Sequence, residues 1–380
     1  MTKKWVNIAD VLFFQEGPGV RNTQYTTSGV KLLNVANLVD GKVDLSKSDR
    51  YISEEEAYGK YRHFLCDDGD FVIASSGIKV EYIDKKMGFV DASMLPLCMN
   101  TSTIRFKVLD ENQLRIRYFM YYLKSKHFKE QLTKQITGSA QLNYGPSHLK
   151  KMIMPLIDIT VQDEIISCMD KLQSIIETRQ RELIELDRLM KARFVELFGD
   201  PRSNPFGFEK KRLKDTCKVI TGNTPSRAIA EYYGDYIEWI KTDNIVSGIL
   251  NPTQATESLS EKGMNVGRTV EKDSILMACI AGSIASIGRV CITDRTVAFN
   301  QQINAVVPEQ YNILFLYVLF QMSKDYLVED INMALKGILS KSKLEEKEFI
   351  IPPMDLQEQF SDFVKQVNKS KFDTMTFAPI

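Results

Sequence analysis

The chain has 380 residues, of which 44% are hydrophobic and 26% charged, a composition typical of soluble globular proteins and long enough for two or three hydrophobic cores. Its 49 basic and 49 acidic residues cancel, so any affinity for nucleic acid requires charge to be segregated on the surface. The first ten residues lack the apolar core of a signal peptide and no apolar run approaches the ~18 residues of a membrane span, so we expect a cytoplasmic protein with no membrane partner.

The cysteines and histidines show no pattern that predicts a metal or redox site. Six cysteines are scattered along the chain without a CxxC pair, and His63, His127 and His148 lack metal-ligand spacing. We therefore expect reduced cysteines that pack in cores, no metal ion, and no catalytic residue.

Residues 1–158 are predicted to form a first module that is rich in strands. The segment VKLLNVANLVDGKV at 30–43 indicates a strand followed by a polar turn, and a charged turn at 68–70 leads into the apolar strand FVIA. An aromatic-rich helix follows near Tyr118 to His127. Its aromatic residues, such as Phe119, are expected in the core, and the lysines from Lys124 to Lys134 fit a solvated helix face as well as a phosphate contact.

Residues 159–198 are predicted to form one long central helix, because the stretch from Thr160 has no Gly or Pro and is rich in helix-forming residues. At 1.5 Å per residue it would be a rod of roughly 58 Å, whereas a core helix of an ordinary globular domain seldom exceeds about 20 residues. Apolar residues spaced alternately four and three apart are typical of a seam that packs along a partner helix. The seam residues are Ile165, Met169, Leu172, Ile176, Leu183, Leu186 and Met190.

A linker at 199–209, rich in Gly, Pro and Asn, separates this helix from a second module at 210–354 that repeats the first. Gly17 matches Gly222 at an offset of 205 positions, and Asn37 matches Asn244 at 207. Further along, Asn100 corresponds to Asn300 and Gln162 to Gln357. The two modules therefore favour one fold used twice.

A distal helix is predicted at 355–371, with seam residues Phe360, Val364 and Val367, followed by a non-helical tail at 372–380. If the two helices lie antiparallel, the modules are related by a pseudo-twofold axis and sit at the two ends of a shared rod. The prediction is an α/β (α+β) fold with duplicated domains joined by long antiparallel coiled-coil helices.

Four motifs together resemble the DNA-specificity subunit of type I restriction-modification enzymes. They are MKARFVELFGDP at the end of the central helix, TGNTPS at 221–226, FNQQINAV at 299–306 and IPPMDLQEQF at 351–360. The resemblance covers nearly the whole chain. It implies that each module is a target-recognition domain reading one half of a bipartite, asymmetric site in double-stranded DNA. It also implies that the helices set the spacing and hold two methyltransferase subunits, with restriction/translocase subunits joining them.

The resemblance also implies a bacterial or archaeal, non-catalytic subunit, and the sequence agrees because no NPPY-type tetrad, glycine-rich S-adenosylmethionine loop or Walker A motif is present. The chain is expected to carry no cofactor; S-adenosylmethionine would bind the methyltransferase, and ATP and Mg would bind the restriction subunit. The distal helix is shorter than the family pattern, which puts in doubt the contact with one methyltransferase subunit.

Base reading in the major groove uses Arg, Lys, Asn, Gln, Ser and Thr on loops, so polar residues at strand ends are the candidate DNA contacts. In the first module they are Arg21, Asn22, Asn34, Asn37, Ser75, Ser76, Lys79, Asn100, Thr101, Ser139, Gln141 and Asn143. In the second module they are Thr221, Asn223, Thr224, Ser226, Arg227, Lys241, Thr242, Asn244, Ser283, Ser286, Arg289, Asn300, Gln301 and Gln302.

Two alternatives stay open. The asparagines at 37, 100, 244 and 300 fit turn formation or backbone capping as well as base contact. At the level of function, a protein-only coiled-coil adaptor scaffold without DNA readout is favoured slightly by the zero net charge.

Overall fold

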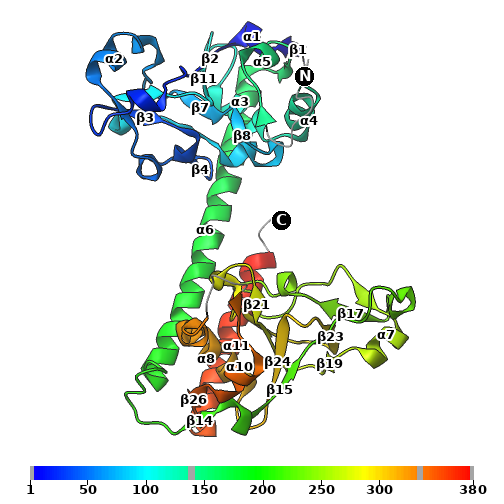
Figure 1. Ribbon diagram of the computed structural model, residues 1–380. Coiled ribbons are helices and arrows are strands. Elements are labelled where there is room, and N and C mark those ends of the chain that lie inside the picture. The colour runs from blue at the N-terminus through cyan, green and yellow to red at the C-terminus, as the bar shows by residue number, and fades with distance from the viewer. Residues whose placement is uncertain (1–3, 136–141, 332–336, 377–380) are drawn as a thin grey trace. The chain divides into compact units, whose positions relative to one another are not determined.

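The computed structural model describes residues 4–135, 142–331 and 337–376. The chain divides into two compact units, Met1–Ser174 and Ile175–Ile380 (Figure 1). The division falls inside the long helix α6 (Ile159–Phe198), so each unit contains part of it. The reason is packing: Ile165 and Ile166 lie against the core of the first unit, whereas Met190, Phe194 and Phe198 belong to the core of the second.

The first unit is built on a four-stranded antiparallel sheet in the order β2-β11-β7-β9, beside a three-stranded sheet in the order β10-β3-β6. Its strands are β1 (Lys4–Asn7), β2 (Leu12–Glu16), β3 (Val30–Leu33), β4 (Leu38–Val39), β5 (Lys42–Val43), β6 (Tyr51–Ile52), β7 (Phe71–Ala74), β8 (Ser76–Ile78), β9 (Met87–Phe89), β10 (Leu97–Met99), β11 (Thr103–Val108), β12 (Leu142–Asn143) and β13 (Ile153–Leu156). Its helices besides α6 are α1 (Ile8–Val11), α2 (Glu54–Tyr58), α3 (Ile116–Leu123), α4 (Lys126–Gln135) and α5 (Pro146–Leu149).

The second unit repeats this arrangement with a four-stranded sheet in the order β15-β24-β20-β22 and a five-stranded sheet in the order β16-β18-β17-β23-β19. Its strands are β14 (Lys210–Arg212), β15 (Cys217–Thr221), β16 (Tyr233–Gly234), β17 (Ile237–Ile240), β18 (Ser258–Leu259), β19 (Thr269–Val270), β20 (Ile275–Ala278), β21 (Ile280–Ala281), β22 (Val290–Ile292), β23 (Val297–Phe299), β24 (Ile303–Pro308), β25 (Gly337–Ile338) and β26 (Glu348–Ile350). Its helices besides α6 are α7 (Glu261–Val266), α8 (Ile313–Met322), α9 (Lys324–Val328), α10 (Lys341–Glu346) and α11 (Met354–Thr376).

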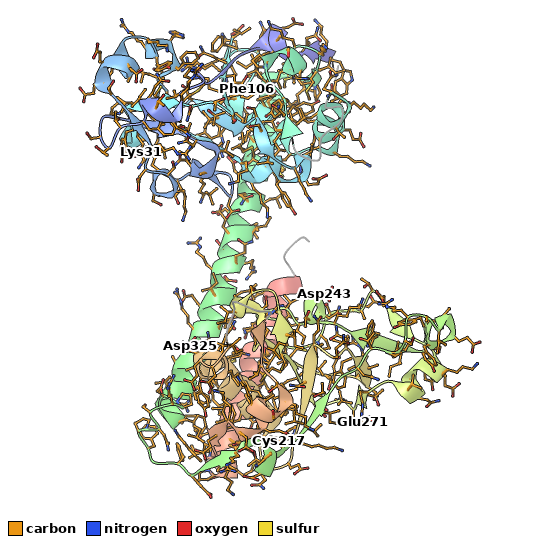
Figure 2. The ribbon with its side chains drawn as sticks, in the orientation of Figure 1. Lys31, Phe106, Cys217, Asp243, Glu271 and Asp325 are labelled. Atoms are coloured by element: carbon orange, nitrogen blue, oxygen red, sulfur yellow. The ribbon has the colours of Figure 1, made fainter. Side chains whose placement is uncertain are left out.

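Each four-stranded sheet contains a central strand that is buried on both faces. All four residues of β7 and all four of β20 are buried, which explains why these segments are apolar without alternation. Phe106 on β11, labelled in Figure 2, is 1% exposed and contacts the rings of Phe71 and Phe119. Phe119 of α3 is buried in the first of these cores, as the sequence predicts, and Phe315 and Phe320 of α8 are buried in the second.

Gln162 and Gln357, which are matched by the repeat, have the same surroundings in both units. Gln162 Oε1 accepts a hydrogen bond from the backbone N–H of Arg115 at 2.9 Å, and Gln357 Oε1 accepts one from Asn312 at 2.9 Å. Each glutamine also donates to a carbonyl five residues earlier, and each is at most 1% exposed. A buried amide satisfied in the same way in both units confirms that the fold is duplicated.

Within the second unit, α6 and α11 pack antiparallel along the predicted seam. The Phe360 ring lies 5.5 Å from the rings of both Phe194 and Phe198, while Lys371, further along α11, pairs with Asp187. Val364 and Val367 are buried in the same core as Met190, and Leu186 packs against it. The seam on the part of α6 before Leu186 is more open: Ile165, Met169, Ile176 and Leu183 are half-buried, and Leu172 is exposed.

The expected non-helical tail at 372–380 is wrong for its first residues, because α11 continues to Thr376. Lys371 and Thr374 are buried in the second unit, and the ion pair with Asp187 holds this turn. No Gly or Pro interrupts the segment before Pro379, so the helix has no local reason to stop at Lys371.

Two further findings concern membranes and thiols. Across residues 4–135, 142–331 and 337–376, no helix is both long and apolar enough to cross a bilayer. All six cysteines are unpaired and five of them are buried, Cys168 being exposed. Burial raises the pKa of Cys279 to about 12, so this thiol stays protonated and packs as an apolar group, as the sequence predicts.

The repeated glycines give a test of the duplicated scaffold. A Cβ on Gly17 would lie 2.1 Å from the Asn100 carbonyl oxygen, and one on Gly222 would lie 2.2 Å from that of Asn300. We expect Gly17→Ala and Gly222→Ala each to lower the free energy of unfolding by about 1–3 kcal/mol through overpacking.

Urea unfolding followed by tryptophan fluorescence measures this effect. Each unit contains one tryptophan, Trp5 in the first and Trp239 in the second. Changing one tryptophan to Phe leaves the remaining one as the reporter of its own unit. Gly19→Ala and Gly282→Ala are the matched controls, because nothing lies within 4 Å of a Cβ at either position. Equal unfolding curves for Gly17→Ala and Gly19→Ala would contradict the predicted clash.

Candidate nucleic-acid interface

The predicted contact loops of the second unit start where two parallel strands end. β17 and β23 pair in parallel, and the backbone N–H of Asn300, directly after β23, donates to the Ile240 carbonyl at 3.0 Å. Lys241 follows β17 and leads into the 3-10 helix η9 (Thr242–Asn244), where Figure 2 labels Asp243. Because the carboxyl ends of parallel strands meet at one edge of a sheet, the two loops lie together, a position where ligands commonly bind.

The first unit has the same edge. β3 and β10 pair in parallel, and the N–H of Asn100, directly after β10, donates to the Leu33 carbonyl at 3.1 Å. Asn34 follows β3 and precedes the 3-10 helix η2 (Val35–Asn37). The candidate residues that directly follow these parallel strands therefore lie at one sheet edge within each unit.

Asn37 and Asn244 close the turn after the first parallel strand of each unit. Asn37 Oδ1 accepts from the Asn34 N–H at 2.9 Å, and Asn244 Oδ1 accepts from the Lys241 N–H at 3.0 Å. Their amide groups donate to carbonyls of the next segment, those of Asp44 and Gln254. Both residues are buried, so the geometry favours the turn-forming alternative over base contact for this pair.

Asn34, Asn100 and Asn300 are also held inside their units. Asn100 Nδ2 donates to Asn34 Oδ1 at 2.8 Å, and Asn34 Nδ2 donates to the Leu32 carbonyl. Asn300 Oδ1 accepts from the Gln302 N–H at 3.1 Å. All three are at most 9% exposed, so they shape the loops that present other residues.

The remaining candidates of the first unit differ in exposure. Arg21, Asn22, Lys79, Thr101 and Asn143 are exposed, Ser76 is half-buried, and Ser75 is buried. Asn143 stands opposite Ser76 where β12 pairs with β8, and the Ser75 hydroxyl donates to Glu16 at 3.3 Å. Ser139 and Gln141 lie outside the described residues.

In the second unit, the exposed candidates are Thr221, Thr224, Ser226, Arg227, Ser283 and Gln301, and the half-buried ones are Asn223, Lys241, Thr242, Ser286, Arg289 and Gln302. A hydrogen bond from Thr224 to Gln301 joins the 221–227 loop to the turn after β23. The Arg289 side chain donates to the Ser286 and Thr242 carbonyls at 3.3 Å each, which ties the loop between β21 and β22 to η9.

Several lysines considered for phosphate contact are engaged within the first unit. Lys129 pairs with Asp84 at 3.2 Å and Lys126 with Glu130 at 3.7 Å. Desolvation lowers the pKa of the half-buried Lys124, whose ammonium lies over the Tyr121 ring. These contacts favour the structural interpretation of the α3–α4 lysines.

Sequence reasoning missed the aromatic and acidic residues beside the contact loops. Trp239 and Tyr233 lie beneath the Arg227 guanidinium, and Glu257 pairs with both Arg227 and Lys241. In the first unit the Arg50 guanidinium lies over the Tyr25 ring. Glu257 comes near Lys241 only through the pairing of β17 with β18, so no local motif in the sequence could have identified it.

In the parts of the chain that the structure describes, no group of three or more His, Cys, Asp or Glu side chains could hold a metal ion. Both sheet edges carry neutral amides, hydroxyls and basic groups, and the second edge also carries the carboxylate of Glu257. This arrangement can donate and accept hydrogen bonds and neutralise phosphates.

Comparison with known proteins gives one matching family model, described as "Type I restriction modification DNA specificity domain", which matches residues 18–188 and 205–378. A type I restriction enzyme HindI specificity subunit from Haemophilus influenzae is 33% identical over 146 residues, 37% of this chain and 31% of that protein. The MjaIX specificity subunit from Methanocaldococcus jannaschii is 24% identical over 302 residues, 73% of this chain and 68% of that protein. The Haemophilus match thus spans about a third of that relative's length.

Two solved structures share the fold. The S subunit of a type I restriction-modification system from M. genitalium aligns over 99% of this chain and 91% of its own, with a TM-score of 0.55 and 14% identity. A chain from a study of complex assembly and conformational transition of the type I R-M system aligns over 98% and 93%, with a TM-score of 0.55 and 15% identity. At these identities the similarity establishes the fold alone.

The turn role of Asn244 is testable by stability. We expect Asn244→Ala to lower the free energy of unfolding by about 1–3 kcal/mol, because the Lys241 N–H and the Gln254 carbonyl lose their buried partner. Ser283→Ala, which changes an exposed loop residue of the same unit, should stay within about 0.5 kcal/mol of the parent protein. Urea denaturation compares them, and an unaffected Asn244→Ala protein would argue against the turn role.

Proposed function

We propose, for a chain that belongs to the family of type I restriction modification DNA specificity domains, that it is the sequence-specific DNA-binding subunit of a type I restriction-modification system. Each unit reads one half of a bipartite, asymmetric site in double-stranded DNA. The long helices set the spacing between the halves and dock methyltransferase subunits, and restriction subunits join that assembly.

The observation that carries this proposal is that both units use one scaffold to present different side chains at the same sheet edge. The parallel strand pair is present in both units, as are the turn-closing asparagine (Asn37 and Asn244) and the closely packed glycine (Gly17 and Gly222). The exposed residues around them differ between the units. Two similar frames with different polar loops suit the reading of two different short sequences along one duplex.

The chemistry of the loops fits the edges of base pairs. Arg227 is exposed and its guanidinium can donate two hydrogen bonds to the O6 and N7 atoms of guanine, while exposed amides such as Gln301 suit adenine. Exposed cations such as Lys79 in the first unit suit phosphate oxygens. The chain itself performs no catalysis in this proposal.

The reactive groups then come from partner subunits. The methyltransferase subunits bind S-adenosylmethionine and the flipped adenine, and the restriction subunit uses ATP and Mg. The contribution of this chain is to bring them to one sequence.

An apolar cleft in the second unit is the proposed docking site for a methyltransferase subunit. It has a volume of about 610 Å³ and lies between α6 and the end of α11. Its lining residues are Glu182, Glu185, Leu186, Arg188, Leu189, Ala192 and Thr374. Leu189 is 50% exposed, and an apolar side chain of this size in a cleft favours burial by a partner helix.

Arg227→Ala tests base reading. We expect it to cost about 1–3 kcal/mol of discrimination at one base pair, so that the methylated motif becomes degenerate at a single position of one half. Methylome sequencing of a strain carrying the variant measures this directly.

The matched control for Arg227→Ala is Lys218→Ala, which removes the same charge from an exposed position on β15, away from the loops. It should leave the motif unchanged. A motif that stays intact in the Arg227→Ala strain would remove Arg227 from the reading set.

Leu189→Glu tests the docking cleft. A carboxylate placed there is left desolvated when a partner helix covers it, so we expect affinity for the methyltransferase subunit to fall by tenfold or more, about 1.4 kcal/mol. Val195→Glu is the matched control, because Val195 is 44% exposed on the same helix and does not line the cleft. Sedimentation velocity of the mixed subunits gives both affinities, and equal binding by the two variants would contradict this docking site.

The alternative, a protein-only adaptor, is separated from DNA reading by salt dependence. Phosphate contacts release counterions, so the affinity of the complex with methyltransferase for random duplex DNA should fall steeply as salt rises. An adaptor has no reason to bind duplex DNA, so absence of salt-dependent binding would support it.

A further inference from the structure

Arg50 in the first unit and Glu257 in the second occupy the same backbone position. The register of β3 with β6 pairs Val30 with Ile52, and that of β17 with β18 pairs Ile237 with Leu259, so both pairs are related by the same offset of 207 positions. Arg50 and Glu257 directly precede β6 and β18. Lys31, which is labelled in Figure 2, lies on β3 in the first of these two strand pairs.

One hydrogen bond repeats at this position. The Arg50 carbonyl accepts from the Leu32 N–H at 2.9 Å, and the Glu257 carbonyl accepts from the Trp239 N–H at 3.1 Å. The backbone is therefore conserved between the units while the side chain changes from a cation to an anion.

Glu257 joins the two basic residues of the second sheet edge. One of its oxygens accepts from Arg227 at 2.7 Å and the other from Lys241 at 2.5 Å. The hydrogen bond from Lys241, followed by that from Arg227, lowers the pKa of Glu257, so this carboxyl is ionised at neutral pH. The three charged groups thus form a fixed cluster with a net charge of +1.

Two aromatic rings lie against the charged cluster of Arg227, Lys241 and Glu257. The Arg227 guanidinium lies 4.6 Å from the Tyr233 ring centre and 5.4 Å from that of Trp239, and the Lys241 ammonium lies 5.1 Å from the Trp239 ring. Trp239 is buried, and its Nε1–H donates to the Asn223 carbonyl, which fixes the ring. The polar ends remain open to solvent, since the Arg227 side chain is 58% exposed and that of Glu257 is 35% exposed.

The first unit also has an aromatic ring at the equivalent place, but the charged groups above the ring are different. Thr26 forms a β-bridge with Tyr51 in the first unit, and Gly234 pairs with Ser258 in the second. Tyr51 and Ser258 are matched by the offset of 207 positions, so their partners Thr26 and Gly234 also match. Tyr25 and Tyr233, which directly precede these partners, therefore correspond. The Arg50 guanidinium lies 5.2 Å from the Tyr25 ring centre, and its Nη1 lies 3.5 Å from the Tyr25 hydroxyl. At this edge each unit therefore has an arginine stacked on a tyrosine, but the arginine comes from different loops. Among the described residues, the arginine of the second edge pairs with an acid, Glu257, and no such pair is seen for Arg50.

We propose that this position, Arg50 in the first unit and Glu257 in the second, is a specificity-determining residue of each DNA-reading edge. The inference rests on the proposed function. Glu257 holds Arg227 and Lys241 in one orientation toward a guanine-containing step of the major groove, and Arg50 reads its own base edge directly.

The negative charge of Glu257 adds discrimination. On a duplex of the wrong sequence, Arg227 and Lys241 gain only phosphate attraction, and the carboxylate between them opposes it. On the correct sequence, the same carboxylate keeps both donors aligned with their acceptors. Glu257 therefore weakens binding to random DNA more than binding to the target, a repulsive element that sharpens specificity.

The experiment compares Glu257→Gln with the parent chain, each assembled with its methyltransferase. The first readout is the methylated motif in the cell. The second is the affinity for a duplex carrying the parent motif and for a random duplex of equal length, over a range of salt. We expect random-duplex binding to become tighter, the ratio of target to random affinity to fall about tenfold, and one half of the motif to become degenerate at one position.

One variant serves as a control and another as a second test. Glu231→Gln removes an exposed, ion-paired acid of the same unit, which bonds Lys262, and should leave the motif and the affinity ratio unchanged. Arg50→Gln should make the other half of the motif degenerate and, with the opposite sign of charge change, weaken random-duplex binding.

A Glu257→Gln complex that binds target and random DNA more weakly in equal proportion, with an unchanged motif, would assign Glu257 to structure and overturn the inference. So would unchanged values throughout. If the parent complex itself binds no DNA and directs no methylation, the proposed function fails first.

Discussion

The parallel pairing of β3 with β10, and of β17 with β23, determines where the candidate contact residues of each unit lie. Because both strands of a parallel pair end at the same edge, residues about 65 positions apart in sequence, such as Asn34 and Asn100, become direct hydrogen-bond partners. The loops that leave this edge are held by buried amides that bond backbone groups. The frame is thus rigid where the exposed side chains need to be placed.

Comparing the two units separates residues that build this frame from residues that differ on it. Asn37 and Asn244 make the same hydrogen bond, and Gly17 and Gly222 lie equally close to a carbonyl. Arg50 and Glu257 share a backbone position and carry opposite charges. Because the protein is duplicated, its two units can be compared with each other. Positions whose side chains differ on the repeated backbone are those where the two halves of a DNA site would be distinguished.

The repeat, the long helix and the part of the seam that packs between α6 and α11 could be predicted from the sequence, because each depends on spacing along the chain. The glycine and glutamine matches needed only a constant offset, and Phe360 and Val364 follow the periodicity of a packed helix. The predicted end of α11 at Lys371 is too early, because the segment before Pro379 has no Gly or Pro and the helix continues to Thr376. The ion pair between Lys371 and Asp187, which holds this turn, joins residues that are distant in sequence. Among the site residues, side-chain type identified the loops but could not separate buried asparagines from exposed ones, and Glu257 became visible only through strand pairing.

In the proposed function, one chain with two similar edges selects two separated DNA sequences. Methylome sequencing of a strain with the methyltransferase subunit, with and without this chain, tests it most directly. We expect methylation to depend on the chain and to mark a motif of two specific, unlike halves separated by a fixed stretch of unspecified bases. Methylation that persists without the chain, or a single contiguous motif, would contradict it.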